Sequence, residues 1–234
     1  MFRLTPVVKN LLIINGLFFL AQQAFPSFMI THFSLFHFYS PLFEPHQVIT
    51  HMFMHGDFMH LFGNMFALFM FGPLLEGNWG SKRFLIFYTA TGLGAVALHL
   101  GVKHIELINV ASSLSSEQFN EVLTYGLTSI NQGIPFSLAA QDSLNAIINT
   151  PTLGASGAVF GILLGFGMMF PNMMIMIYFL FPMKAKHLVI LYGAFELYAG
   201  LANHAGDNVA HFAHLGGMLF GWLLIKKWGL RRIH

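Results

Sequence analysis

The stretch Gly154–Phe170, GASGAVFGILLGFGMMF, decides the fold class of this chain. It contains no charged residue, and Gly157, Gly161 and Gly165 recur at every fourth position. Residues at that spacing share one face of a helix. Small residues on a membrane helix let a neighbouring backbone approach closely. The stretch therefore predicts a membrane helix over residues 155–170 that carries a glycine face and begins near Ser156.

The composition agrees with a membrane protein. Of the 234 residues, 56% are hydrophobic and 9% are charged, and the mean hydropathy is +0.65. A soluble globular domain has about 25% charged residues, so a water-soluble fold is excluded. The absence of cysteine excludes disulfides, thiolate catalysis and cysteine-ligated metal centres. The net charge of +2 indicates no nucleic-acid partner, and no polar linker divides the chain, so we predict a single domain over residues 1–234.

Apolar segments of suitable length recur along the whole chain. A helix needs about 20 apolar residues to cross a hydrocarbon core of about 30 Å. Six segments qualify, at approximately 10–30, 58–75, 84–102, 155–170, 187–202 and 209–225. The first is expected to be retained as a span, because no small-residue cleavage site lies near Ala24.

The positive charges indicate an orientation. Cytoplasmic connections carry an excess of Lys and Arg. With both termini in the cytoplasm, only Lys103 falls on the opposite side of the membrane. The sequence thus predicts an all-α, polytopic bundle of six transmembrane helices with both termini cytoplasmic. Whether residues 171–181 extend the fourth helix past Pro171 or form an interfacial strand is left open by the pattern.

Two long segments lie on the non-cytoplasmic side, residues 31–57 and the insertion, which we define as residues 103–154. The insertion contains a capping-box pattern at Ser115–Gln118, followed by an apolar-spaced stretch through Leu127. Such a stretch is compatible with an amphipathic helix. The favoured interpretation is an ordinary surface loop with a helical turn.

A second glycine face lies on the last predicted span. Gly217 and Gly221 are four residues apart, and His214 precedes Gly217 by three, so the histidine shares the glycine face. If this face packs against that of the fourth span, Ser156 and His214 come within hydrogen-bond reach. A serine hydroxyl is a weak nucleophile until a base accepts its proton, and neutral histidine does so near physiological pH. We therefore predict Ser156 as nucleophile and His214 as base.

The second span adds two hydrogen-bond donors. His60 and Asn64 are four residues apart and share one helical face. Both can donate to the oxyanion that develops during acyl transfer. Taken alone they are better explained by polar contacts between helices, worth about 1 kcal/mol each.

Three motifs together resemble the rhomboid family of intramembrane serine proteases. They are His-Leu-Phe-Gly-Asn at residues 60–64, Gly-Ala-Ser-Gly at 154–157 and Ala-His-Leu-Gly-Gly at 213–217, on the second, fourth and sixth spans in the family's order, with Glu76 twelve residues past Asn64. The resemblance implies a Ser156–His214 dyad without an acidic third member and an oxyanion hole lined by His60 and Asn64. It also implies that Phe160 packs against the histidine. The supporting residues are Gly154, Gly157, Phe160, Gly217 and Gly221.

The chain departs from the family pattern in two places. Residues 31–57 lack the Trp-Arg pair found in the first external loop of many rhomboids, which leaves the anchoring of that loop in question. The insertion is also longer than the family core needs. His211 competes with His214 as the base, but only His214 has glycines three and seven residues later.

The expected activity is that of an intramembrane serine endopeptidase with no cofactor and no metal. Its partners would be single-span or polytopic membrane proteins within the lipid bilayer, and its expected location is a bacterial inner membrane.

Two alternatives remain. One is a rhomboid-like protein that binds membrane clients without cutting them. The other is a metal protein, because the chain has 13 histidines, with His51, His55 and His60 close together. Against the metal protein, Met52 rather than Glu follows His51, and no clustered carboxylates suit a di-iron site.

Overall fold

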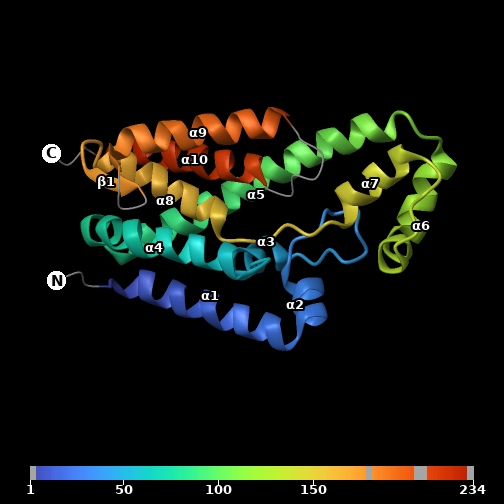
Figure 1. Ribbon diagram of the computed structural model, residues 1–234, viewed down its shortest axis with the longest axis horizontal. Coiled ribbons are helices and arrows are strands. Elements are labelled where there is room, and N and C mark those ends of the chain that lie inside the picture. Colours follow the sequence, from blue (N-terminus) through green and yellow to red (C-terminus); the bar gives the residue numbers. More distant parts are fainter. Residues whose placement is uncertain (1–3, 178–180, 203–209, 231–234) are drawn as a thin grey trace.

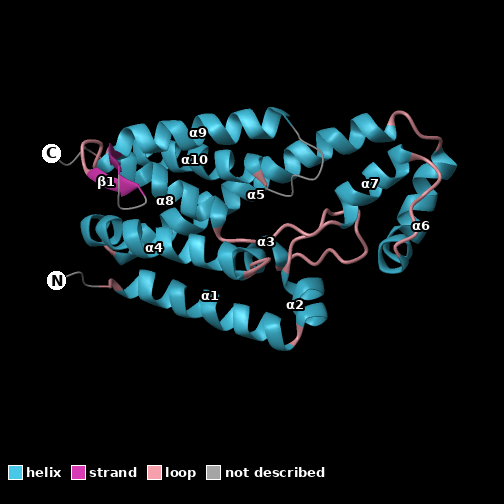
Figure 2. Ribbon diagram, viewed as in Figure 1, coloured by secondary structure: helices cyan, strands magenta, loops and turns pink. Residues whose placement is uncertain are grey.

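The structure, a computed structural model, describes residues 4–177, 181–202 and 210–230. Its long helices run side by side as one bundle (Figure 1). They are α1 (Pro6–Ala24), α4 (Phe58–Trp79), α5 (Ser81–Ala111), α8 (Ser156–Met169), α9 (Ala185–Ala202) and α10 (His211–Lys227). Shorter helices fill the two long connections: α2 (Pro26–Phe33), α3 (Gln47–Thr50), the 3-10 turn η1 (His51–Phe53), α6 (Ser116–Gln132) and α7 (Ala139–Asn149). Of the described residues 76% are helical, which confirms the predicted all-α polytopic bundle (Figure 2).

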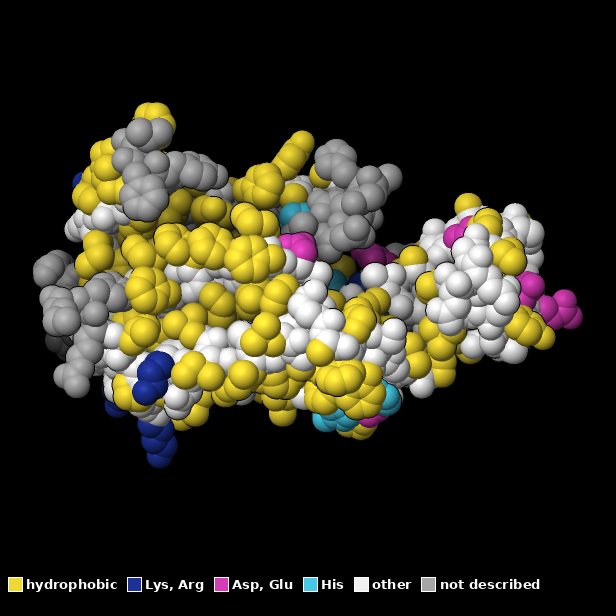
Figure 3. Space-filling model, turned by 60° about the horizontal axis from the view of Figure 1, so that its bottom comes forward, with side chains coloured by type: hydrophobic (Ala, Val, Ile, Leu, Met, Phe, Trp, Pro, Cys, Tyr) yellow, Lys and Arg dark blue, Asp and Glu magenta, His cyan; other side chains and the backbone are white. Residues whose placement is uncertain are grey.

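Five predicted spans each correspond to one bundle helix, whereas the first, 10–30, is divided at Phe25 between α1 and the short α2. Among the described residues, α1, α4 and α5 are long and apolar enough to cross a membrane, and α8 is apolar but shorter. Hydrophobic side chains cover much of the bundle face shown in Figure 3, as a lipid-facing surface requires. The count of six crossings and the cytoplasmic position of both termini stay predictions.

Local signals explain where the helices begin. Proline occupies the first turn of α1 and α2, at Pro6 and Pro26, where its missing N–H removes no helical bond. The Asp57 carboxylate caps α4 by accepting from the backbone N–H of His60 at 2.8 Å. Gly80, at φ 78°, turns the chain from α4 into α5.

The fourth bundle helix ends before Pro171. After Met169 the chain enters β1 (Met174–Ile177), which pairs antiparallel with β2 (Phe181–Lys184). Residues 171–181 therefore do not extend α8, although 178–180 lie outside the described residues. With 14 residues, α8 is about 21 Å long, shorter than a hydrocarbon core of about 30 Å.

The insertion is more ordered than the sequence suggested. The expected surface loop is wrong: α6 is a full helix of 17 residues, and its capping box is formed by Ser115 and Gln118. Helix α5, with 31 residues, is about 46 Å long, so it extends past a core of about 30 Å and carries the insertion away from the bundle (Figure 1). The insertion and the end of α5 share a separate apolar core of Leu107, Val122, Leu144 and Ile148.

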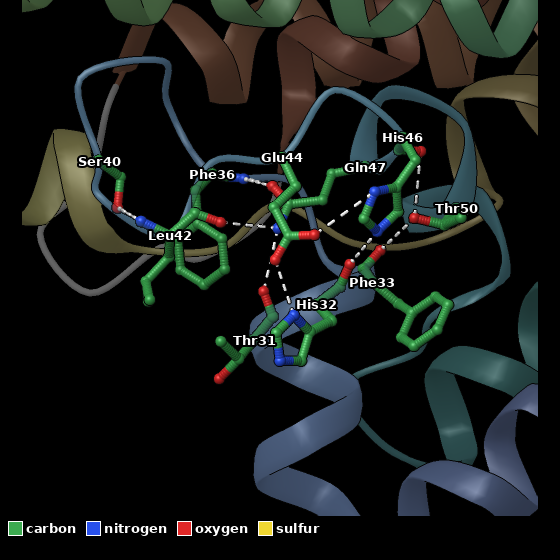
Figure 4. A network of polar contacts seen from close by, with 10 residues as sticks. All are labelled: Thr31, His32, Phe33, Phe36, Ser40, Leu42, Glu44, His46, Gln47 and Thr50. Atoms are coloured by element: carbon green, nitrogen blue, oxygen red, sulfur yellow. Dashed lines mark hydrogen bonds and ion pairs between the residues drawn. The ribbon is translucent and has the colours of Figure 1, made fainter.

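A buried glutamine anchors the loop at residues 31–57 (Figure 4). Gln47 is fully buried, and its amide nitrogen donates to the carbonyl oxygens of Thr31 at 3.0 Å and Leu42 at 2.8 Å. Its side-chain oxygen accepts from the Phe36 N–H at 3.3 Å. These bonds tie the middle of the loop to its start at Thr31, so the missing Trp-Arg pair does not leave it unanchored.

Candidate active site

The glycine faces of α8 and α10 are in contact, as their spacing predicts. A Cβ placed on Gly217 would overlap the carbonyl oxygen of Gly157, and one on Gly221 would lie 3.4 Å from the carbonyl oxygen of Gly161. A Cβ placed on Gly157 would likewise overlap the Cβ of Ala95 on α5. Three helix backbones therefore meet around the first turn of α8, and any larger side chain would separate them.

Ser156 is the first residue of α8, and backbone hydrogen bonds fix the segment before it. Leu35 and Thr152 exchange two such bonds, of 2.8 and 2.7 Å, and the Gly154 N–H donates to the His51 carbonyl at 2.9 Å. Gly154 has φ 124°, a conformation that favours glycine. These contacts hold Ser156 at the helix start, where backbone N–H groups have no helical partner.

Gly154 also keeps the space between Ser156 and His60 open. A Cβ at this position would lie 2.8 Å from His60 Nε2 and 3.7 Å from Ser156 Oγ. The imidazole and the hydroxyl therefore face the same small space.

His214 lies beside the first turn of α8. Its ring stacks on Phe160, one turn after Ser156, with centroids 4.1 Å apart and planes at 6°. In addition, a Cβ on Gly157 would lie 3.5 Å from the Ala213 carbonyl oxygen. Among the described residues Ser156 and His214 form no direct hydrogen bond, and such bonds often tighten only once substrate is bound.

Asn64 presents an unpaired donor in the same region. It is 6% exposed, and its Nδ2 has no hydrogen-bond partner among the described residues. A buried amide donor without a partner costs about 1–3 kcal/mol, so such a group indicates a ligand. One turn earlier on α4, His60 is half-buried and its ring stands edge-on to His55, with centroids 5.1 Å apart.

Glu196 of α9 was missed by the sequence analysis. It is 4% exposed, and its Oε2 lies 2.6 Å from His211 Nδ1 and 2.9 Å from His214 Nδ1. The His214 contact has the distance of an ion pair but not the direction of a hydrogen bond, whereas the His211 contact has both. The signal was present, because a lone glutamate inside an apolar span is by itself a functional candidate.

The two competing histidines therefore differ in their surroundings. Both face Glu196, and His214 stacks on Phe160, an aromatic ring of α8. His211 instead lies edge-on to Phe195 of α9, with centroids 6.4 Å apart. This difference supports His214 over His211 as the base.

One group of possible metal ligands occurs among the described residues. The ligand atoms of Glu196, His211 and His214 lie within 4.8 Å of one another. Two ligands bonded to one tetrahedral zinc at about 2.0–2.1 Å are roughly 3.3 Å apart, so the 2.6 Å contact between Glu196 and His211 is that of a hydrogen bond.

His51, His55 and His60, the possible metal ligands suggested by the sequence, do not belong to this group. His51 Nδ1 lies 2.9 Å from the Gln47 carbonyl oxygen, which engages that nitrogen in a hydrogen bond. Burial lowers the pKa of His51 and of His55 to about 4, so both rings are neutral at pH 7.

A small cavity of about 20 Å³ adjoins Ser156. Its lining comes from the segment before α8 and from α5 and α10, and includes His51, Thr152, Gly154, Ala210 and Ala213. A site of this size has room for a single water molecule.

Comparisons with known proteins show the family of this chain. The family model described as Rhomboid domain matches residues 42–229. The chain is 28% identical over 229 residues to the RHOMBOID-like protein 12, mitochondrial, of Arabidopsis thaliana. The aligned region covers 94% of this chain and 59% of that protein. It is also 28% identical over 183 residues to the Rhomboid protein 1, mitochondrial, of Saccharomyces cerevisiae, covering 76% of this chain and 42% of that protein.

A shorter match, 38% identical over 47 residues, is to the Putative rhomboid protease YdcA of Bacillus subtilis, covering 20% of this chain and 24% of that protein. The chain thus spans about three fifths and two fifths of the first two relatives. The family match supports a membrane protein, and the mitochondrial names of the first two relatives do not support a bacterial inner membrane. The matched region contains the motifs of α4, α8 and α10, and this chain belongs to the rhomboid family.

Proposed function

We propose that this chain is an intramembrane serine endopeptidase in which Ser156 is the nucleophile and His214 the base. The observation that carries the proposal is the stacking of His214 on Phe160, one turn after Ser156, at the place where Gly217 meets Gly157. In this mechanism the Ser156 oxygen attacks the substrate carbonyl carbon while its proton passes to His214. The leaving amine then takes that proton, and an acyl-enzyme on Ser156 remains.

The oxyanion of the tetrahedral intermediate would be held by Asn64, His60 and free N–H groups at the start of α8. The unpartnered Nδ2 of Asn64 supports this role, because a donor that is already in place needs no reorganisation during the reaction. Gly154 contributes by leaving space between His60 and Ser156.

Hydrolysis of the acyl-enzyme needs water inside the membrane. The shortness of α8 supports a site below the membrane surface, open to the non-cytoplasmic side. The cavity beside Ser156 has room for one water molecule within reach of the acyl group.

The substrates would be single-span or polytopic membrane proteins. The carbonyl groups of a helix are hydrogen-bonded within it, so a scissile bond should lie where a substrate span is easily unwound, with a small residue at the cut. A bacterial inner membrane stays a prediction for the location.

The test is cleavage of a model single-span substrate by the purified full-length chain in lipid nanodiscs, beside Ser156→Ala and His214→Gln. We expect the wild type to cut at one position, mapped by mass spectrometry, and both variants to be inactive although folded. Equal cleavage by wild type and Ser156→Ala would refute the nucleophile. A wild type that binds the substrate but never cuts it would favour the client-binding alternative.

A further inference from the structure

Glu196 brings a carboxylate against the proposed base inside the bundle. Its Oε2 lies 2.9 Å from His214 Nδ1 and 2.6 Å from His211 Nδ1. The side chains of Glu196, His211 and His214 are 6%, 9% and 11% exposed. Removing a carboxylate from water is costly unless its partners compensate, and here both partners are imidazoles.

Helix packing, rather than a loop, fixes this arrangement. Gly200 lies one turn after Glu196, and a Cβ there would be 3.2 Å from the Cβ of His211. Further along the same contact, a Cβ on Gly193 would be 3.2 Å from the Met218 side chain. Helices α9 and α10 are therefore packed closely on both sides of Glu196, and the two histidines, three residues apart, share the face that meets it.

The carboxylate selects one tautomer of His214. A bare lone pair on Nδ1 would be repelled by the carboxylate oxygen 2.9 Å away, so the neutral imidazole carries its hydrogen on that nitrogen although the contact is not aligned as a hydrogen bond. The lone pair is then on Nε2, the atom that a serine proton must reach. Stacking on Phe160 restricts the plane of the ring, so its rotation and its tautomer are both constrained.

The Glu196 carboxylate also stabilises the protonated form of His214. When Nε2 takes the Ser156 proton the ring becomes an imidazolium, the hydrogen on Nδ1 stays in place and Glu196 stays ionised. A negative charge 2.9 Å from Nδ1 stabilises that cation in a low-dielectric bundle. The proton on Nε2 then leaves with the departing amine.

His211 has a supporting role in this geometry. Its bond to Glu196 is the shorter one and is well directed, whereas the contact to His214 lacks the direction of a hydrogen bond. The carboxylate is thus held by His211 and available to His214.

We propose that Glu196, held by His211, is a positioning residue that orients His214 and stabilises its protonated form. The inference rests on the proposed endopeptidase function. It adds an acidic member where the family resemblance implies none.

The experiment compares Glu196→Gln, Glu196→Asp and the control Tyr198→Phe in the full-length chain in nanodiscs. Gln keeps the shape of Glu but removes its charge, and Tyr198 is an exposed residue on the same helix. We expect Glu196→Gln to lower kcat at least about 10-fold with KM changed less than about twofold. Glu196→Asp should recover part of kcat, and Tyr198→Phe should match the wild type. An unchanged kcat in folded Glu196→Gln would overturn the inference.

A second measurement needs no change at Glu196. Nitrogen-15 NMR of the neutral His214 ring, in protein with native Glu196, should show hydrogen on Nδ1 and a bare Nε2. The opposite tautomer would overturn the proposal, as would stoichiometric transition metal in washed wild type that is absent from Glu196→Gln.

The two proposals fail in different ways. If Ser156→Ala is inactive while Glu196→Gln keeps full kcat, only the positioning role is lost. If Ser156→Ala cleaves as the wild type does, the proposed function itself is wrong.

Discussion

The α8–α10 contact and the insertion are stabilised by different kinds of packing. In the contact, glycines let backbones touch, and charged or polar side chains such as Glu196, His214 and Asn64 are buried beside them. In the insertion, α6 begins with a capping box and packs through Val122 on aliphatic side chains, as a small soluble domain does.

This difference suggests that the α8–α10 region carries the reaction and that the insertion has a structural role. Buried polar groups inside a membrane bundle are costly and persist where they have a function. The core of the insertion lies along the far part of α5 and is built on aliphatic side chains (Figure 1). Its buried amides are paired locally: Gln141 Nε2 donates to Glu121, Asn145 Nδ2 to the Gly126 carbonyl oxygen, and Asn149 Nδ2 to Asn145 Oδ1. Changes in the α8–α10 region should therefore abolish activity, and changes in the insertion should mainly affect its own stability.

The largest effect is expected at Asn64. Asn64→Ala should lower kcat about 100- to 1000-fold with little change in KM, because it removes a donor used only in the transition state. Kinetics with the single-span substrate measure this. The control is Asn78→Ala on the same helix, an exposed residue whose Nδ2 donates to the Leu74 carbonyl. Similar losses in both variants would contradict the oxyanion role.

The next effect concerns the glycine contact itself. Gly217→Ala places a methyl group onto the Gly157 carbonyl oxygen, so α8 and α10 must separate. Overpacking of this kind costs about 1–3 kcal/mol, and a misplacement of about 1 Å lowers activity about 100-fold. Thermal unfolding and kinetics check both parts. Gly101→Ala on α5, where a Cβ meets nothing within 4 Å, serves as the control and should retain activity.

A matched pair of leucines sharpens the comparison between the two regions. Leu144 in the insertion and Leu68 in the bundle are both fully buried, so Ala at either should cost about 2–5 kcal/mol. Hydrogen exchange should show Leu144→Ala loosening residues 116–149 with cleavage retained. Leu68→Ala should lower the stability of the bundle and its activity together. Loss of cleavage in Leu144→Ala would mean that the insertion takes part in the reaction.

The last effect is a dependence of stability on pH, and it is absent at neutral pH. Burial lowers the pKa of His51 to about 4 from its usual 6.5, so the unfolded chain binds the proton more readily. Stability from this group is complete above pH 6.5 and falls by up to about 1.4 kcal/mol per unit between pH 6.5 and 4. Thermal unfolding of His51→Gln should show a shallower fall than the wild type. His187→Gln, at an exposed histidine, should keep the wild-type slope.

Periodicity predicted much of this structure. Glycine spacing on residues 155–170 and 209–225 predicted the helix contact, because backbone approach depends only on local side-chain size. The position of Ser156 at a helix start and the packing of Phe160 on His214 were also expected. The roles assigned to Ser156, His214, His60 and Asn64 stay predictions until activity is measured.

Long-range partners were not accessible in the same way. Glu196 lies 18 residues before His214 on another helix, and no spacing rule connects them. Gln47 was missed for a similar reason, since two of its partners, Phe36 and Leu42, lie in irregular backbone and the third, Thr31, lies on the separate helix α2. The length of α6 was not predicted because a capping box and apolar spacing do not show that a separate core stabilises the helix.

The central claim is that Ser156 is made nucleophilic by an imidazole across the glycine contact. Its most direct test is intact-mass and peptide mapping of the full-length chain after reaction with a fluorophosphonate. We predict one adduct on Ser156, absent from Ser156→Ala and formed much more slowly in His214→Gln. An adduct at another residue, or equal labelling of wild type and His214→Gln, would contradict it.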